Sequence, residues 1–318
     1  MLNFRVSGEG KTIVFLHGFL ESLTMWDYLP LQQLGSRNIF IDLPGHGKSP
    51  LTDKSEHPSI EFMADEVIAV LAHLEVAEFS IVGHSMGAYV GLLIKQKLEF
   101  CNLLVLLNSN FWCDNEQKKI DRLRVVKIVL KAKNIFVNEA IPNLFWKPEL
   151  HKDEIKKLKD EALKMSSEAI AYATLAMRER KDFSKKINQN PSGYVLIHGV
   201  YDKLVSISDL ESRINSRKQL HIITNAGHMS HIENSDEIME ILSKLFINPK
   251  SVIHPFIILP IISQFLLLFT FFQKKSAQLS SNGNPFGSPI NITSTISGGA
   301  LGIWAGFSPY YDTLYCIP

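Results

Sequence analysis

The stretch FSIVGHSMGAYVGLLIKQKL, residues 79–98, decides the fold. An apolar run (79–82) leads into Gly83-His84-Ser85-Met86-Gly87, and apolar residues at helical spacing follow. A G-x-S-x-G sequence between a buried strand and a helix predicts a sharp turn that exposes the serine hydroxyl above the sheet. The flanking glycines allow close packing of strand and helix because they have no Cβ. We therefore predict that Ser85 is a nucleophile.

Similar apolar runs occur on both sides of this stretch, as fully buried parallel strands require. They are TIVFLHG (12–18), NIFIDLPG (38–45), LLVLLNS (103–109), GYVLIHG (193–199) and LHIITNAGH (220–228). Amphipathic segments such as residues 60–75 separate them. Strands that alternate with helices predict an α/β protein with a mostly parallel, doubly wound sheet. The polar motifs follow the strands, at the edge where ligands bind in such sheets.

A nucleophilic serine needs a general base and a carboxylate that orients it. Asp202 follows the run ending at residue 199, and His228 follows the last run, 26 residues later. The chain order Ser, Asp, His is the order expected for this turn. We predict Ser85, Asp202 and His228 as catalytic residues. Four other candidates rank lower: His231 at the start of a helix, His84 as a residue that shapes the turn, and Asp209 and Asp114 as replacements for Asp202.

The sequence His17-Gly18-Phe19 directly follows the first apolar run. A tight turn there can present the Phe19 amide, and the amide of Met86 follows the nucleophile. Two such amides can hold the oxygen that becomes negative during acyl transfer. We predict an oxyanion hole formed by Phe19 and Met86.

Residues 111–190 contain Lys- and Glu-rich helical segments without a convincing strand. A helical insertion in an α/β chain predicts a cap over the active site. Its aromatic residues Phe111, Trp112, Phe145 and Trp146 indicate either a hydrophobic acyl pocket or the core of the cap. We place Trp112, Trp146 and His17 at the substrate pocket.

The composition excludes several classes of protein. Lys and Arg number 33 against 32 Asp and Glu, so a basic surface for nucleic acid is not expected. The 3 cysteines have neither metal-ligand nor disulfide spacing, and the N-terminus lacks a signal-peptide pattern. We therefore expect a cytoplasmic enzyme that acts on a small molecule and needs no metal or organic cofactor. No oligomeric state follows from the sequence.

The expected catalytic domain, residues 1–248, is followed by an atypical tail, residues 249–318. Residues 252–272 carry no formal charge and precede Lys274-Lys275. A largely apolar segment of 21 residues is long enough to cross a bilayer, although Pro255, Pro260, Ser263 and Gln264 count against a span. Three interpretations stay open: a membrane anchor, an apolar segment packed on the domain or a partner, or non-native appended sequence. The first would make the protein membrane-associated.

Over residues 1–248 the chain resembles the α/β-hydrolase superfamily. The motifs that carry the resemblance are HGF (17–19), DLPGHGKS (42–49), GHSMG (83–87), GVYDKLV (199–205) and NAGHMSHIEN (225–234). The resemblance implies a structural role for the loop 42–49 and an esterase-type cap that ends near residues 176–182. Ser85, where dehalogenases and epoxide hydrolases have aspartate, favours the esterase, enol-lactonase and related branches.

The resemblance and the motifs together predict a serine hydrolase that cleaves a small or medium carboxylic ester through an acyl-enzyme. One alternative is a lyase similar to the pyruvate-eliminating synthase of the menaquinone pathway, whose histidine loop resembles residues 225–234 of this chain. This chain departs from that synthase at Tyr89 and Val90, which stand where the synthase has an arginine. A carbon–carbon bond hydrolase and a non-catalytic receptor on the same fold are further alternatives. The cap arginines that could bind a carboxylate-rich substrate are Arg122, Arg124, Arg178 and Arg180.

Overall fold

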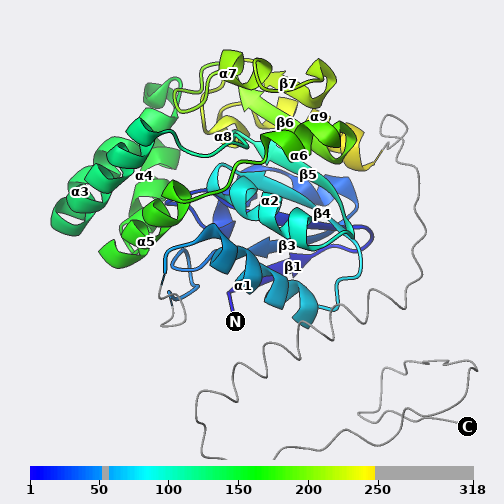
Figure 1. The fold of residues 1–318 in the computed structure, drawn as a ribbon, viewed down its shortest axis with the longest axis horizontal. Coiled ribbons are helices and arrows are strands. Elements are labelled where there is room, and N and C mark those ends of the chain that lie inside the picture. Colours follow the sequence, from blue (N-terminus) through cyan, green and yellow to red (C-terminus); the bar gives the residue numbers. More distant parts are fainter. Residues whose placement is uncertain (52–56, 248–318) are drawn as a thin grey trace, which may run out of the picture. The chain divides into compact units, whose positions relative to one another are not determined.

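The computed structural model describes residues 1–51 and 57–247 of the 318-residue chain. In this part of the chain, seven strands form one sheet in the order β1-β3-β2-β4-β5-β6-β7 (Figure 1). The strands are β1 (Phe4–Ser7), β2 (Thr12–Leu16), β3 (Arg37–Ile41), β4 (Phe79–His84), β5 (Cys101–Leu107), β6 (Tyr194–Gly199) and β7 (Leu220–Ile223). β2 to β7 pair in parallel, and β1 is antiparallel to β3.

The six apolar runs of the sequence coincide with β2 to β7, which confirms the predicted α/β fold. β1 was not predicted, because an edge strand need not be apolar on both faces. Two of its four residues are half-buried and two are exposed. The parallel register brings the last residues of β2, β4 and β5 to one edge, where Leu16 pairs with Gly83 and His84 with Leu107. The predicted catalytic motifs begin at this edge.

Helices cover both faces of the sheet. On one face α1 (Ile60–His73) and α2 (Met86–Lys97) pack together, and α2 also contacts β4 and β5. On the other, one hydrophobic cluster joins the short helices η1 (Leu23–Tyr28) and η2 (Leu31–Leu34), the strands, and α9 (Ser235–Phe246). Three short helices complete the catalytic part: α6 (Ser184–Gln189), α7 (Ile207–Glu211) and α8 (Ser230–Glu233).

The predicted helical cap lies between β5 and β6. It consists mainly of α3 (Glu116–Ala140), α4 (Lys152–Ala162) and α5 (Ser167–Arg178), which lie together at one side of the sheet (Figure 1). α3 has non-helical backbone angles at Ala132. The cap has its own hydrophobic cluster, which reaches Leu20 and Met229 of the catalytic part. This cluster fixes the cap next to the loops after β2 and β7.

No helix among residues 1–51 and 57–247 is long and apolar enough to cross a membrane. The apolar segment 252–272 and the rest of the tail lie outside the described residues.

Candidate active site

Ser85 sits at the turn between β4 and α2, which we call the elbow, with φ 48° and ψ −112°. A left-handed φ in a residue with a Cβ costs about 1–3 kcal/mol and persists only where the surroundings enforce it. Here the Ser85 amide donates to the Leu107 carbonyl at 2.9 Å, and the Ser85 carbonyl accepts from Ser109 Oγ at 2.8 Å. The Ser85 side chain does not cap α2. The turn therefore leaves the hydroxyl available for chemistry.

Gly83 and Gly87 flank Ser85 where no Cβ would fit. A Cβ at Gly83 would lie 2.6 Å from the Ala88 amide nitrogen, and one at Gly87 would lie 2.6 Å from the His17 carbonyl oxygen. Both neighbours are main chain, so a side chain cannot simply rotate away. The close approach of α2 to the end of β2 therefore depends on glycine, as the sequence motif predicts.

Gly87→Ala is expected to lower the free energy of unfolding by about 2 kcal/mol or more, because the added methyl group overpacks a main-chain contact. Gly35→Ala is the matched control, since Gly35 has φ 56° but a methyl group added there would have no atom within 4 Å. It should cost only about 1 kcal/mol through backbone strain. Urea unfolding of both variants measures the difference. Equal losses would show that the elbow tolerates a Cβ at Gly87.

Asp202 and His228 form a direct hydrogen bond on the loops after β6 and β7. His228 Nδ1 lies 2.8 Å from Asp202 Oδ2, and both side chains are buried. Asp202 Oδ1 accepts from the amides of Leu204 (2.8 Å) and Val205 (3.3 Å). Burial alone would raise the pKa of Asp202, but its contact with His228 holds that pKa below the usual range. An ionised Asp202 fixes the Nδ1–H tautomer of His228 and leaves Nε2 free to accept a proton.

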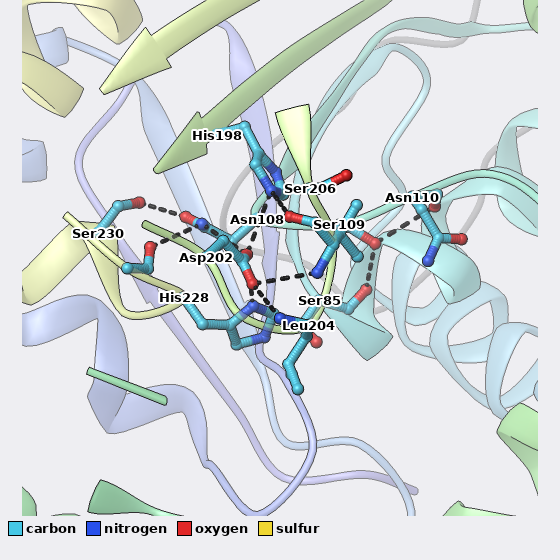
Figure 2. A network of polar contacts seen from close by, with 12 residues as sticks. Ser85, Asn108, Ser109, Asn110, His198, Asp202, Leu204, Ser206, His228 and Ser230 are labelled. Carbon is cyan, nitrogen blue, oxygen red and sulfur yellow. Dashed lines mark hydrogen bonds and ion pairs between the residues drawn. The ribbon is translucent and has the colours of Figure 1, made fainter. Parts of the chain in front are cut away.

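Two residues that were not predicted also contact Asp202 (Figure 2). Asn108 donates to Asp202 Oδ2 at 3.1 Å and to the Gly227 carbonyl at 2.9 Å. It therefore links the loop after β6 that carries Asp202 (the acid loop) to the loop after β7 that carries His228 (the histidine loop). His198 Nε2 lies 3.3 Å from the same carboxylate oxygen and donates to the Val205 carbonyl at 2.8 Å. The signal in the sequence was their position: a polar residue at or just after the end of a buried strand.

The main chain of His228 is held from two sides. Its amide donates to the carbonyl of Leu144, in the cap, at 2.9 Å. Its carbonyl accepts from His84 Nε2 at 3.0 Å, and the rings of His84 and His228 are 5.1 Å apart. Because His84 immediately precedes Ser85, this contact brings His228 to the predicted nucleophile. The structure therefore gathers Ser85, Asp202 and His228 at one edge of the sheet.

The predicted oxyanion loop is built on His17, Gly18 and Glu21. The His17 ring is fully buried; Nδ1 donates to the Gly18 carbonyl (2.8 Å) and Nε2 accepts from the Leu43 amide (2.9 Å). Burial lowers the pKa of His17, which fits a neutral ring with these two roles. The Gly18 amide donates to Glu21 Oε2 at 2.5 Å. These bonds occupy both ring nitrogens of His17, a predicted pocket residue.

The two tryptophans predicted at the pocket contact the catalytic part. The Trp146 ring stacks on Tyr201, which precedes Asp202, with 4.1 Å between centroids. Trp112 contacts the guanidinium of Arg213, 4.6 Å from its ring. Phe111 and Phe145, the other aromatic residues of this set, are fully buried.

All four cap arginines named from the sequence have carboxylate partners. Arg122 and Arg180 both pair with the buried Asp114, and Arg124 and Arg178 pair with Asp121 and Glu179. The Arg180 guanidinium also lies over the Tyr89 ring, 4.4 Å from its centre. Each of these cations thus has a carboxylate partner, with Asp114 shared by two of them, and Asp114 contacts arginine rather than His228.

Among the described residues, no group of three or more His, Cys, Asp or Glu side chains could hold a metal ion. A surface cleft of about 460 Å³ lies between η1 and α4. None of the three candidate catalytic residues lines it; its lining residues are Thr24, Met25, Asp27, Tyr28, Lys157, Leu158, Asp160, Glu161 and Lys164. We therefore do not assign the substrate to that cleft.

The model of the alpha/beta hydrolase family matches residues 13–241, which include the elbow, the acid loop, the histidine loop and the cap. The chain belongs to this family. Membership agrees with the strand order, the turn at Ser85 and the Asp202–His228 contact.

The named proteins to which the chain is similar include a transferase component and a synthase. The chain is 26% identical over 247 residues to the dihydrolipoyllysine-residue acetyltransferase component of an acetoin cleaving system from Pseudomonas putida, covering 74% of this chain and 63% of that protein. It therefore spans less than two thirds of that relative. It is 22% identical to the 2-succinyl-6-hydroxy-2,4-cyclohexadiene-1-carboxylate synthase of Salmonella paratyphi B, covering 74% of this chain and 93% of the synthase.

A similar solved structure is that of a thermophilic esterase from Thermogutta terrifontis. It superimposes with a TM-score of 0.69 at 25% sequence identity, covering 78% of this chain and 93% of the esterase.

Proposed function

We propose that the protein is a serine hydrolase that cleaves a small or medium carboxylic ester, or a related acyl substrate, through an acyl-enzyme on Ser85. The observation that carries this proposal is the 2.8 Å contact between His228 and Asp202 beside the strained turn at Ser85. A nucleophile, a base and an orienting acid in this order are the parts that acyl transfer needs.

In the proposed mechanism, His228 Nε2 accepts the proton of Ser85 Oγ as that oxygen attacks the ester carbonyl carbon. The carbonyl electron pair moves to oxygen, and the amides of Phe19 and Met86 stabilise the resulting oxyanion. When the tetrahedral intermediate collapses, the alcohol leaves with the proton from His228. Water then attacks the acyl-enzyme while His228 accepts the water proton, and His228 returns that proton to Ser85 Oγ as the acyl–Oγ bond breaks and the acid leaves. The Asp202 carboxylate stabilises the imidazolium in both steps.

The paired arginines favour an uncharged ester over a carboxylate-rich substrate. The sequence predicts a lyase as the alternative, and the match to the synthase supports that alternative. A substrate with several carboxylates would require cations free to bind it. The four cap arginines already pair with Asp114, Asp121 and Glu179, which supports the ester.

The cytoplasm is the proposed location. In the part of the chain that the structure describes, Cys101 is buried, Cys113 is exposed and both thiols are free. Free thiols suit a reducing compartment.

The full-length protein should hydrolyse p-nitrophenyl esters from acetate to octanoate. The acyl-chain length with the highest kcat/KM then measures the length of the acyl pocket. Acid-quenched reactions should carry the acyl mass on the peptide that contains Ser85, because deacylation follows a covalent step. A fluorophosphonate should label the same serine. If the folded protein hydrolyses none of the esters and the probe does not label it, the esterase proposal fails and the lyase or receptor alternative gains weight.

A further inference from the structure

Glu21 and His84 form a buried ion pair under the proposed active site. His84 Nδ1 lies 2.9 Å from Glu21 Oε2, and the two side chains are only 1% and 3% exposed. The same Glu21 oxygen accepts from the Gly18 amide at 2.5 Å. On the other side of the ring, His84 Nε2 lies 3.0 Å from the carbonyl oxygen of His228. Three segments of the chain thus meet at one imidazole: the loop at Gly18 and Glu21, the end of β4 and the loop at His228.

The contacts of His84 define its protonation. A carbonyl oxygen has no proton to give, so Nε2 must donate to His228. A carboxylate also accepts, so Nδ1 must donate to Glu21, and the ring is an imidazolium. Although burial opposes both charges, Glu21 raises the pKa of His84, and His84 lowers the pKa of Glu21 to about 2. The contacts and the two pKa shifts together favour the charged form of the pair.

The neighbouring histidines do not supply a second positive charge for Glu21. The ring of His231 lies 5.0 Å from that of His84, and burial lowers the pKa of His231 to about 3, so His231 is neutral. Asp202 is ionised and directly bonded to His228. The buried His17 lies on the Glu21 side and is also neutral. Among the described residues, His84 is hence the cation that balances the negative charge of Glu21.

We propose that Glu21 and His84 are positioning residues, whose ion pair ties the oxyanion loop at Gly18 to the main chain of the catalytic His228. This role rests on the proposed function. Gly18 precedes Phe19, whose amide is expected to bind the oxyanion, and His84 precedes Ser85. The pair thereby sets the distances between oxyanion donor, nucleophile and base. Catalysis depends on such distances more steeply than substrate binding does.

The test uses full-length wild type, Glu21→Gln, His84→Gln and the double variant in p-nitrophenyl ester hydrolysis. Each single substitution should lower kcat by about 10- to 100-fold and change KM by less than about threefold. The kcat of the double variant should be no more than about threefold below that of the less active single variant, because the two residues act as one unit. If Glu21→Gln does not fold, His84→Gln tests the same pair from the other side.

A spectroscopic measurement separates positioning from mere stability. ¹⁵N NMR of the ring nitrogens should show both N–H groups of His84 at pH 8 in wild type, and one in Glu21→Gln. The stability control is Asn38→Ala, at the start of β3, where Asn38 accepts from Ser36 Oγ at 2.7 Å. It should lower Tm without lowering kcat.

The positioning role is overturned if Glu21→Gln keeps the wild-type kcat, if the losses simply add, or if wild-type His84 is neutral at pH 8. Ser85→Ala distinguishes this failure from that of the proposed function. If Ser85→Ala abolishes hydrolysis while Glu21→Gln keeps the wild-type kcat, only the role of the pair is wrong. If wild type hydrolyses no ester, the proposed function is wrong.

Discussion

Ser85→Ala is expected to lower kcat for ester hydrolysis by about 10⁵- to 10⁶-fold, because the acyl-enzyme cannot form without the Ser85 oxygen. The remaining rate would come from binding and from the oxyanion donors. Steady-state hydrolysis of p-nitrophenyl butyrate measures the loss. Tm should stay close to the wild-type value, since Ser85 Oγ does not cap α2.

Ser192→Ala is the matched control for this substitution. Ser192 is exposed and its hydroxyl bonds only locally, to Asn190 at 3.1 Å. Its removal should leave kcat unchanged. A Ser85→Ala protein that keeps a tenth or more of the wild-type kcat would rule out an acyl-enzyme on Ser85.

Lowering the pH from 7 to 5 is expected to reduce the free energy of unfolding by about 3 kcal/mol or more. Burial lowers the pKa of both His46 and His231 to about 3. Both rings stay neutral in the folded protein and bind a proton in the unfolded chain below about pH 6.5. The unfolded state therefore gains protons as the pH falls, at a cost of roughly 2 kcal/mol per histidine by pH 5. His17, whose pKa burial also lowers, acts in the same direction.

His84 acts in the opposite direction, since its pKa is raised in the folded state. Its contribution to stability is complete below about pH 6.5 and is lost as the pH rises, so it offsets part of the acid effect. Glu21, with a pKa lowered to about 2, contributes above about pH 4.5 and adds no change between pH 7 and 5. The buried neutral histidines therefore dominate.

Urea unfolding at pH 7, 6 and 5 measures this acid sensitivity. His231→Phe should reduce the number of protons bound on unfolding by about one, because it removes a buried ring whose two nitrogens have no hydrogen-bond partner among residues 1–51 and 57–247. His57→Gln, which replaces an exposed histidine, is the control substitution. Equal stability at pH 7 and pH 5 would contradict the prediction.

The sequence contained enough information to predict the sheet, since β2 to β7 are nearly continuous apolar runs and the elbow motif identifies β4 and α2. It could not predict β1, whose short edge position imposes little hydrophobic pattern. The candidate residues Ser85, Asp202 and His228 were predictable because each lies within a few residues of the end of a strand, and parallel strands end at the same edge.

Contacts that depend on tertiary packing were not predictable. Glu21 lies three residues after Gly18 in a loop, and nothing in the local pattern indicates that it faces His84, 63 residues away. Asn108 links Asp202 to Gly227 over separations of 94 and 119 residues. The pairing of the cap arginines likewise depends on how Asp114 is buried between α3 and the residues after α5.

The hydrogen bond from the His228 amide to the Leu144 carbonyl has a consequence for protein engineering. Caps of related enzymes are natural units to exchange when substrate preference is to be altered. A chimera that replaces the whole segment between β5 and β6 would also remove an acceptor that holds His228, the proposed base. Crossover points placed to retain residues 142–146 preserve that acceptor. They also preserve the hydrogen bond from the Trp146 amide to the Glu233 carboxylate. Donor sequences should therefore be grafted around this turn, and α3, α4 and α5 are the parts free to vary.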